Sequence, residues 1–184
     1  MTKQNVRGRI IKSLGGFYYV ADSEQKGNII ECRARGAFRQ QNVKPCVGDW
    51  AQVELTPQGK GYVVEIEERK NSLVRPPLAN LDQLVLVVSI ADPAPNAFVL
   101  DKLIAIAEYQ EIEPIIVITK CDLADPEEFA QIYRKAGFTV LETKSLQHEG
   151  IESVMEILKD KTSAFCGNSG AGKSTLLNAI DPRL

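Results

Sequence analysis

Gly167–Ser174 reads Gly-Asn-Ser-Gly-Ala-Gly-Lys-Ser, and this stretch decides how the rest of the chain is interpreted. The spacing G-x-x-x-x-G-K-S is typical of a phosphate-binding loop, here called the phosphate loop. An apolar run, Ser163–Cys166, precedes it, and a helical pattern over Ser174–Ile180 follows it. Glycines let successive backbone N–H groups face phosphate oxygens, and a helix N-terminus favours negative charge. The stretch therefore predicts strand, phosphate site and helix in sequence.

The side chains of this loop predict a nucleoside triphosphate site with a magnesium ion. Lys173 would neutralise the β- and γ-phosphates, and Ser174 would offer its hydroxyl to Mg²⁺. Such a loop usually opens a nucleotide-binding domain, whereas this one lies near the end of the 184 residues. The predicted phosphate-binding residues are Gly167, Asn168, Ser169, Gly170, Ala171, Gly172, Lys173, Ser174 and Thr175.

Composition indicates a globular protein of one or two domains, with 44% hydrophobic and 25% charged residues. The sequence has no run of eighteen apolar residues, and Met1–Arg7 lacks the apolar segment of a signal peptide, so neither a transmembrane helix nor a leader is expected. The four cysteines form no Cys-x-x-Cys pair. Their wide spacing favours reduced thiols in a cytoplasmic protein over a zinc site or disulfides.

Charge is distributed unevenly along the chain. Residues 1–75 carry 13 Lys and Arg against 8 Asp and Glu, and the remaining residues carry 9 against 16, giving a net charge of −2 overall. A basic front and an acidic back predict two domains with different partners. The alternative is that both sets of charges only solubilise their own surfaces.

Residues 1–70 predict an all-β domain. Short alternating or β-branched runs are separated by glycine-rich and polar turns, which indicates five strands in some seventy residues. A five-stranded OB-like barrel is the expected architecture. The expected strands are Val6–Lys12, Phe17–Ala21, Asn28–Arg33, Trp50–Leu55 and Tyr62–Ile66.

Basic and aromatic residues are interleaved in this front domain. Barrels of this kind bind nucleic acid through a basic face and stacking aromatic side chains. The alternative is that the aromatic residues, Phe17, Tyr18, Tyr19 and Phe38, form the core and that the arginines form a solvated face. The candidate RNA-binding residues are Arg7, Arg9, Arg33, Arg35 and Arg39.

The pattern changes at residues 71–83, which we expect to be a linker because the adjacent prolines Pro76 and Pro77 should stop both strand pairing and helix. Residues 84–184 then alternate between buried strands and amphipathic helices, which predicts a parallel sheet covered by helices on both sides. Asp125 is expected to be the N-cap of the second helix. The expected strands are 84–90, 115–119, 138–141 and 163–166, and the expected helices cover 98–110, 126–136, 150–159 and 174–180.

Ligands of such sheets bind at the carboxyl ends of the strands. Thr119–Asp122, at the end of the second predicted strand of the sheet, reads Thr-Lys-Cys-Asp and is here called the guanine motif. A carboxylate at Asp122 could accept both N1–H and N2–H of guanine, a pair of donors that adenine lacks, and the Lys120 stem could lie over the base. Taken alone, the four residues could equally be a surface turn with a helix-capping Asp. The predicted guanine-binding residues are Thr119, Lys120, Cys121 and Asp122, with Lys144 and Ser145 offering a backbone N–H to the base oxygen.

The order of these motifs reverses the usual one, because the guanine motif precedes the phosphate loop. A circular permutation of a GTPase sheet produces this order without changing where the loops meet. It predicts that the strand at 163–166 lies beside the strand at 84–90.

The chain resembles the circularly permuted, small-ribosomal-subunit-dependent GTPases of bacterial ribosome assembly. The resemblance rests on the barrel, on Arg75–Pro77 followed by Ala79–Gln83, on Thr119–Asp122 and on the phosphate loop, all in this order. It implies GTP binding and hydrolysis stimulated by the small ribosomal subunit, a role in late maturation of that subunit, contact with ribosomal RNA, and a cytoplasmic monomer.

The sequence also departs from this family. Relatives carry Ser or Ala where this chain has Lys144. The resemblance further implies two switch segments and a zinc domain, and the zinc is expected only there, beyond the residues given. We therefore assign no catalytic residue and expect the 184 residues to turn over little GTP. We interpret His148 as an exposed loop residue. Two other functions stay open: a P-loop ATPase or small-molecule kinase, and a non-enzymatic RNA-binding module with a structural nucleotide site.

Overall fold

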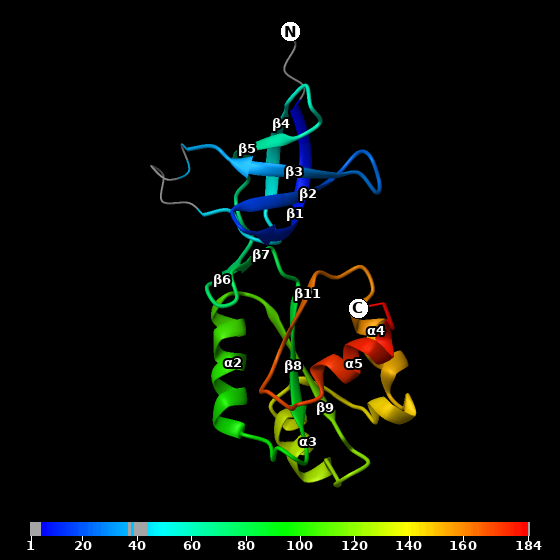
Figure 1. Ribbon diagram of the computed structural model, residues 1–184. Helices are drawn as coiled ribbons and strands as arrows, with labels where there is room; N and C mark the ends of the chain where they lie inside the picture. The colour runs from blue at the N-terminus through cyan, green and yellow to red at the C-terminus, as the bar shows by residue number, and fades with distance from the viewer. Residues whose placement is uncertain (1–4, 37, 39–43, 184) are drawn as a thin grey trace. The chain divides into compact units, whose positions relative to one another are not determined.

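The computed structural model describes residues 5–36, 38 and 44–183. Its chain divides into two compact units, Met1–Asn80 and Leu81–Leu184 (Figure 1). No helix in the described part of the chain combines the length and the apolar character that crossing a membrane requires.

The first unit is a closed five-stranded barrel, as expected. Its strands lie in the order β1-β2-β3-β5-β4, with β3 and β5 parallel and the other pairs antiparallel. Arg39, in the connection between β3 and β4, lies outside the described residues. The strands are β1 (Asn5–Leu14), β2 (Phe17–Asp22), β3 (Ile29–Ala34), β4 (Trp50–Leu55) and β5 (Gly61–Ile66).

Alternate residues of these strands point into the barrel and form its core, because successive side chains of a strand face opposite sides. Tyr18 and Phe38 belong to this core, so the core interpretation holds for two of the four aromatic residues. Phe17 and Tyr19 are half-buried on the outer face. The other core residues include Ile10, Val20, Ile30, Cys32, Val53 and Val63.

The proline-containing segment differs from the expected linker. Here β6 (Ser72–Leu73) pairs with β7 (Leu78–Ala79) in a short antiparallel sheet, and the first unit continues to Asn80. The two prolines do not prevent this pairing because they occupy the connection between the strands, where no ladder N–H is needed. The functional division of the chain into barrel, linker and nucleotide domain stays a prediction.

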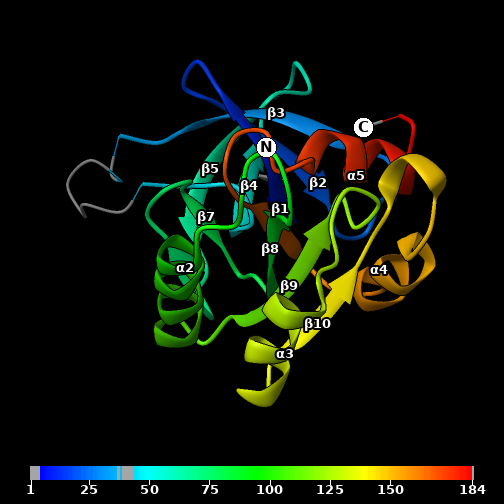
Figure 2. The ribbon, with the colours of Figure 1, turned by 90° about the horizontal axis from the view of Figure 1, so that it is seen from below.

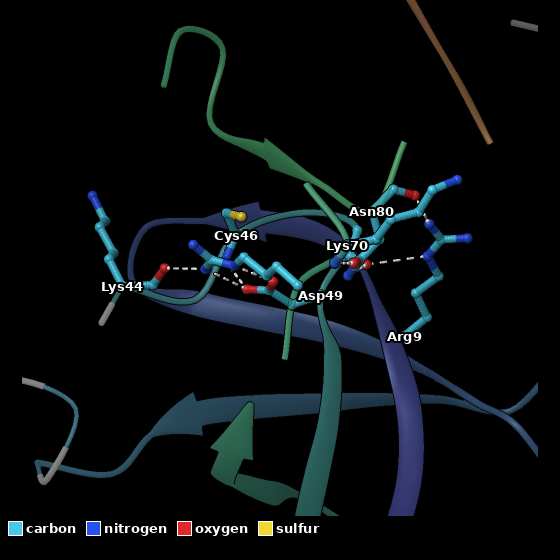
Figure 3. Close-up of polar contacts among 8 residues, drawn as sticks. Arg9, Lys44, Cys46, Asp49, Lys70 and Asn80 are labelled. Carbon is cyan, nitrogen blue, oxygen red and sulfur yellow. Dashed lines mark hydrogen bonds and ion pairs between the residues drawn. The ribbon is translucent and has the colours of Figure 1, made fainter. Parts of the chain in front are cut away.

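Polar contacts attach this hairpin to the barrel (Figure 3). The Asn80 amide donates to Gly48 O over 3.0 Å, and Arg9 Nη2 donates to Asn80 O over 2.9 Å. Gly48 has φ 97°, and a Cβ there would stand 2.0 Å from Ala79 O, so a side chain would separate hairpin and barrel. Asn80 itself has φ 56°, a conformation that asparagine tolerates better than most residues.

A buried ion pair lies beside these contacts (Figure 3). The Asp49 side chain is fully buried, and its two carboxylate oxygens accept from Arg69 Nε at 2.7 Å and Arg69 Nη2 at 2.8 Å. Asp49 also accepts from Cys46 N at 2.8 Å. Burial, and secondarily Asp49, raise the pKa of the Cys46 thiol to about 11, so this thiol stays protonated at neutral pH.

The second unit contains a four-stranded sheet in the order β10-β9-β8-β11, and all of its neighbouring strands are parallel. Ser163–Cys166 pairs with Gln83–Leu86, which confirms the adjacency that the permuted order predicts. The strands are β8 (Gln83–Ser89), β9 (Glu113–Thr119), β10 (Thr139–Glu142) and β11 (Ser163–Cys166).

Helices cover both faces of this sheet, with α2 on one side and α4 and α5 on the other (Figures 1 and 2). Val85, Val117, Val154 and Leu176 meet in the core beneath α4 and α5. Helix α3 begins one residue later than expected: Pro126 is its N-cap, and Asp125 accepts from Glu127 N at 3.0 Å. The helical elements are α2 (Ala97–Tyr109), α3 (Glu127–Lys135), the 3₁₀ turn η1 (Ser145–Gln147), α4 (Ile151–Leu158) and α5 (Lys173–Ile180).

Candidate nucleotide-binding site

The phosphate loop connects β11 to α5, as the sequence predicts. Gly167 has φ 154°, and a Cβ there would stand 2.2 Å from Val87 O of the neighbouring strand. Gly172 has φ 83°, and a Cβ there would stand 3.3 Å from Thr119 Oγ1. Both positions therefore require glycine, the first for close approach to β8 and the second for its left-handed backbone. The loop is wound tightly against the sheet that carries the guanine motif.

The Lys173 ammonium lies across the start of this loop. Its Nζ donates to Gly167 O and to Asn168 O, both over 2.7 Å. These two carbonyls hold the positive charge beside the backbone that would surround a phosphate group. Ser174 follows at the start of α5 and is exposed, so its hydroxyl is available to a cation that also contacts the phosphates.

The guanine motif and the phosphate loop are directly bonded to each other. Thr119, at the end of β9, is 1% exposed, and its hydroxyl donates to Ala171 O of the phosphate loop over 2.7 Å. A hydroxyl has a single proton to donate. Thr119 therefore holds the phosphate loop against the sheet, and its proton is already committed to that contact.

The next three residues of the motif form a turn at the strand end. Lys120 adopts φ 60°, and its Nζ donates to Asp92 O, in the loop between β8 and α2. Cys121 N donates to Thr143 O over 3.3 Å. Burial raises the pKa of the Cys121 thiol, so this thiol stays protonated and is a poor nucleophile. Asp122 follows on the exposed side of the turn.

A pocket of about 230 Å³ lies between the two motifs. Its lining combines the acidic and basic side chains of the guanine motif with apolar side chains and the C-terminal end of the phosphate loop. Sequence reasoning missed two of the lining residues, Leu123 and Leu146, which are both exposed. Each stands beside a predicted base-binding segment, and that proximity is the signal that could have identified them. The lining residues are Thr119, Lys120, Asp122, Leu123, Ser145, Leu146, Gly172 and Thr175.

The two residues predicted after β10 lie in different surroundings. Ser145 lines the pocket, and its hydroxyl lies 3.5 Å from the hydroxyl of Thr143. Lys144 forms an ion pair with Glu149 over 2.6 Å. The hydrogen bond to Glu149 raises the pKa of Lys144, so this lysine stays charged and is directed to Glu149. Of the pair, Ser145 is the residue that the structure brings to the pocket.

The described arginines predicted to contact RNA differ in their partners. Arg7 forms a bidentate pair with Glu67 at 2.7 and 2.8 Å and stacks over Trp50. Arg9 binds the carbonyls of Gly48 and Asn80, which joins barrel and hairpin. Arg35 pairs with Glu54 over 2.7 Å, and Arg33 lies over the ring of Phe17 at 4.6 Å.

Comparison with known proteins agrees with this geometry. The RsgA GTPase family model matches residues 66–184, and the RsgA N-terminal domain model matches residues 7–63. The chain belongs to the RsgA GTPase family. Two curated relatives carry the name small ribosomal subunit biogenesis GTPase RsgA. The relative from Caldanaerobacter subterraneus subsp. tengcongensis is 46% identical, and the match covers 98% of this chain and 61% of the relative. The relative from Bacillus subtilis is 43% identical, and the match covers 96% of this chain and 62% of the relative.

Solved structures show the same architecture. The crystal structure of YjeQ from Thermotoga maritima matches with a TM-score of 0.86 and 36% identity, over 98% of this chain and 66% of that one. YloQ, described as a circularly permuted GTPase, matches with a TM-score of 0.81 and 40% identity over the same shares. The permuted fold is therefore shared with these proteins. The chain spans about three fifths of the length of the curated relatives that it matches.

Proposed function

We propose that this chain binds GTP and GDP through the pocket between Thr119–Asp122 and the phosphate loop. The observation that carries the proposal is the hydrogen bond from Thr119 to Ala171, because it holds Thr119–Asp122 and the phosphate loop at the same edge of one sheet. Asp122 would accept from both guanine donors, and the Lys120 stem would cover one face of the ring. Lys173 would exchange its carbonyl partners for phosphate oxygens.

The residues of this site fit a magnesium ion that binds together with the nucleotide. The described residues contain no cluster of three or more His, Cys, Asp or Glu side chains that could hold a metal ion. The exposed Ser174 hydroxyl is the oxygen ligand that this chain would contribute, and nucleotide phosphates and water would supply the others. Bound there, Mg²⁺ would supply positive charge that offsets the charge of the phosphates.

We further propose that the complete protein hydrolyses GTP and acts on the small ribosomal subunit, since its relatives are named small ribosomal subunit biogenesis GTPases. The proposed location is the cytoplasm. The barrel would contact ribosomal RNA, and the subunit would stimulate turnover. We assign no catalytic residue within the described part of the chain, and we expect little turnover from the 184 residues alone.

Side-by-side calorimetric titration with GDP and ADP tests the nucleotide proposal. We expect GDP to bind and ADP to bind at least about 100-fold more weakly, since ADP leaves the Asp122 carboxylate without its two donors. Equal affinity for both nucleotides would support a P-loop ATPase or kinase and would overturn the guanine assignment.

GTP turnover of the full-length protein, measured with and without purified small ribosomal subunits, tests the enzymatic proposal. Stimulation by the subunit supports a ribosome-dependent GTPase. Subunit binding without any turnover would instead favour an RNA-binding module whose nucleotide only stabilises the fold.

A further inference from the structure

The segment between β8 and α2 belongs to neither the guanine motif nor the phosphate loop, yet it lies against both. Ile90–Asn96, here called the β8–α2 loop, reads Ile-Ala-Asp-Pro-Ala-Pro-Asn. The Lys120 ammonium of the guanine motif donates to Asp92 O in this loop. The ring of Pro93 lies so near the phosphate loop that a Cβ at Gly170 would stand 3.4 Å from Pro93 Cδ. The β8–α2 loop therefore adjoins both the base side and the phosphate side of the proposed nucleotide site.

Both ends of the β8–α2 loop are held by hydrogen bonds. At its start, Ile90 N donates to Thr119 O over 3.1 Å, which ties the loop to the end of β9. At its end, the Asn96 side chain accepts from Val99 N over 3.1 Å and caps α2. Two of the residues between these ends are prolines, whose rings restrict the backbone further. The loop is therefore fixed by its own sequence before any ligand binds.

The β8–α2 loop is also packed closely on the phosphate loop. A cavity between these two loops and α2 measures about 20 Å³. It has room for about one water molecule. Pro93 and Pro95 line this cavity from one loop, and Gly167 and Ala171 line it from the other. A displacement of the β8–α2 loop would therefore disturb the phosphate loop as well.

The backbone of Asp92 has a conformation that few residue types adopt. Its φ is 43°, in the left-handed region, where aspartate and asparagine are found more often than other residues with a side chain. The Asp92 side chain is exposed, and the atom that Lys120 contacts is the backbone carbonyl oxygen. The direction of this carbonyl follows from the backbone conformation, so the residue type at position 92 affects a contact that its side chain does not make.

This contact fixes a side chain that would otherwise be mobile. A lysine stem has large rotamer freedom, which is lost when a ligand orders it. Lys120 lines the pocket together with Asp122, and the proposed function places the Lys120 stem over the base. With its ammonium bonded to Asp92 O, the stem is ordered before a nucleotide arrives. Preorganisation of this kind increases affinity because less freedom is lost on binding.

We propose that Asp92 is a positioning residue of the nucleotide site, whose carbonyl oxygen holds the Lys120 ammonium so that the lysine stem is preformed as a cover for the base. The inference rests on the proposed function and adds the β8–α2 loop to that site. The stem contacts the face of the base, whereas Asp122 reads its edge. Asp92 therefore raises the affinity for any purine nucleotide and leaves the choice of base to Asp122.

A double-mutant cycle on the whole chain, measured by calorimetry with GDP, tests the inference. Asp92→Val redirects the carbonyl because valine disfavours a positive φ, and Lys120→Met keeps an unbranched stem without the ammonium. Each single variant should weaken GDP binding about tenfold. In the Lys120→Met background, Asp92→Val should weaken it by less than about twofold more, because the contact is already gone. Asp92→Asn should recover most of the loss seen in Asp92→Val, since asparagine tolerates the same backbone conformation.

Two further measurements separate positioning from a general loss of structure. Inosine diphosphate lacks the guanine amino group, and Asp92→Val should weaken its binding by the same factor as that of GDP. Asp160, in the turn between α4 and β11, is exposed, has φ 57° and is outside the pocket lining. Asp160→Val is therefore the matched control and should leave GDP affinity within about twofold. Circular dichroism confirms that each variant folds.

The contact can also be measured without a nucleotide. Lysine acetylation by a limiting amount of acetic anhydride, followed by peptide mass spectrometry, reports the reactivity of each lysine. Lys120 should react about threefold faster in Asp92→Val than in the wild type, relative to Lys135, an exposed lysine at the end of α3. The reason is that a bonded ammonium must first leave its partner.

The outcomes distinguish this inference from the proposed function. Equal Lys120 reactivity in the two proteins, or an equal effect of Asp92→Val with and without the Lys120 ammonium, would overturn the positioning role and leave the nucleotide site in place. Absence of GDP binding to the wild type would overturn the proposed function and this inference together.

Discussion

The hydroxyl of Thr119 donates a hydrogen bond to the carbonyl oxygen of Ala171 over 2.7 Å, and this contact joins two motifs that lie 52 residues apart. Thr119 ends β9, and Ala171 lies in the phosphate loop after β11. The order of strands along the chain does not matter to this contact, because both strands are parallel and their carboxyl ends reach the same edge of the sheet. A permuted chain can therefore assemble the same crevice as an unpermuted one.

Thr119→Val should weaken GDP binding about tenfold while leaving the preference for GDP over ADP unchanged. Valine keeps the shape of threonine but leaves the buried Ala171 carbonyl without its donor, which costs about 1–3 kcal/mol. Calorimetry with both nucleotides measures affinity and preference together. Thr139→Val, at an exposed position of β10, is the matched control. A loss of base preference in Thr119→Val would instead place Thr119 in contact with the base.

Asp122→Asn should reduce GDP affinity at least about 100-fold and should improve binding of xanthosine diphosphate. The amide offers guanine one acceptor and an unmatched donor, whereas xanthine presents a carbonyl oxygen at the position of the guanine amino group. Competition titration with GDP, ADP and xanthosine diphosphate measures the change. Asp125→Asn, three residues on and outside the pocket lining, is the control. Unchanged GDP binding in Asp122→Asn would contradict the guanine assignment.

Lys173→Ala should abolish measurable nucleotide binding and leave the fold intact. Within the described residues its Nζ donates to the carbonyls of Gly167 and Asn168, so the fold loses little, whereas a bound phosphate would lose the positive charge of this loop. Calorimetry and circular dichroism measure the two effects. Lys161→Ala removes a lysine from an exposed pair with Glu113 and should change neither. Wild-type GDP affinity in Lys173→Ala would show that the phosphates bind elsewhere.

Asp49→Ala should destabilise the barrel by about 3 kcal/mol. It removes a fully buried carboxylate and leaves Arg69, whose side chain is 28% exposed, without its charged partner. Urea denaturation followed by tryptophan fluorescence measures the loss, because Trp50 lies in the barrel. Glu67→Ala breaks the exposed pair with Arg7 and should destabilise the barrel much less, because water screens this pair. Equal costs for the two variants would contradict the distinction between buried and exposed pairs.

Asp22 should make barrel stability depend on acid pH. Its carboxylate accepts from the backbone N–H of Glu24 at 2.8 Å and of Gln25 at 3.1 Å, and the Glu24 contact chiefly lowers the pKa of Asp22. A lowered pKa in the folded state means that the stabilisation is complete above the pKa of an unfolded aspartate and is lost as pH falls through the lowered value.

Thermal unfolding of the wild type and of Asp22→Asn across the acid range measures this contribution. The difference in melting temperature between the two proteins should shrink as pH falls. A constant difference at every pH would show that the turn is stabilised by the shape of Asp22 and not by its charge.

Local patterns in the sequence determined most of the secondary structure of this protein. Apolar alternation and glycine-rich turns predicted the five barrel strands, and continuous apolar runs predicted the parallel strands, because each pattern reflects a periodicity that neighbouring residues carry themselves. The order of the two motifs also predicted that β11 would lie beside β8. The predicted N-cap of α3, Asp125, was wrong by one residue: Pro126 is the N-cap, although the Asp125 carboxylate still accepts from Glu127 N.

Only the tertiary structure decided the partners of individual side chains. Arg9 and Asn80 are 71 residues apart, and nothing near Arg9 in the sequence indicates that its guanidinium binds that carbonyl. The same holds for the exposed Leu146 in the pocket wall and for the Asp92 carbonyl that Lys120 contacts. Sequence fixes which chemical groups a chain carries and how each segment folds, whereas strand register and closure determine which distant groups come within bonding distance.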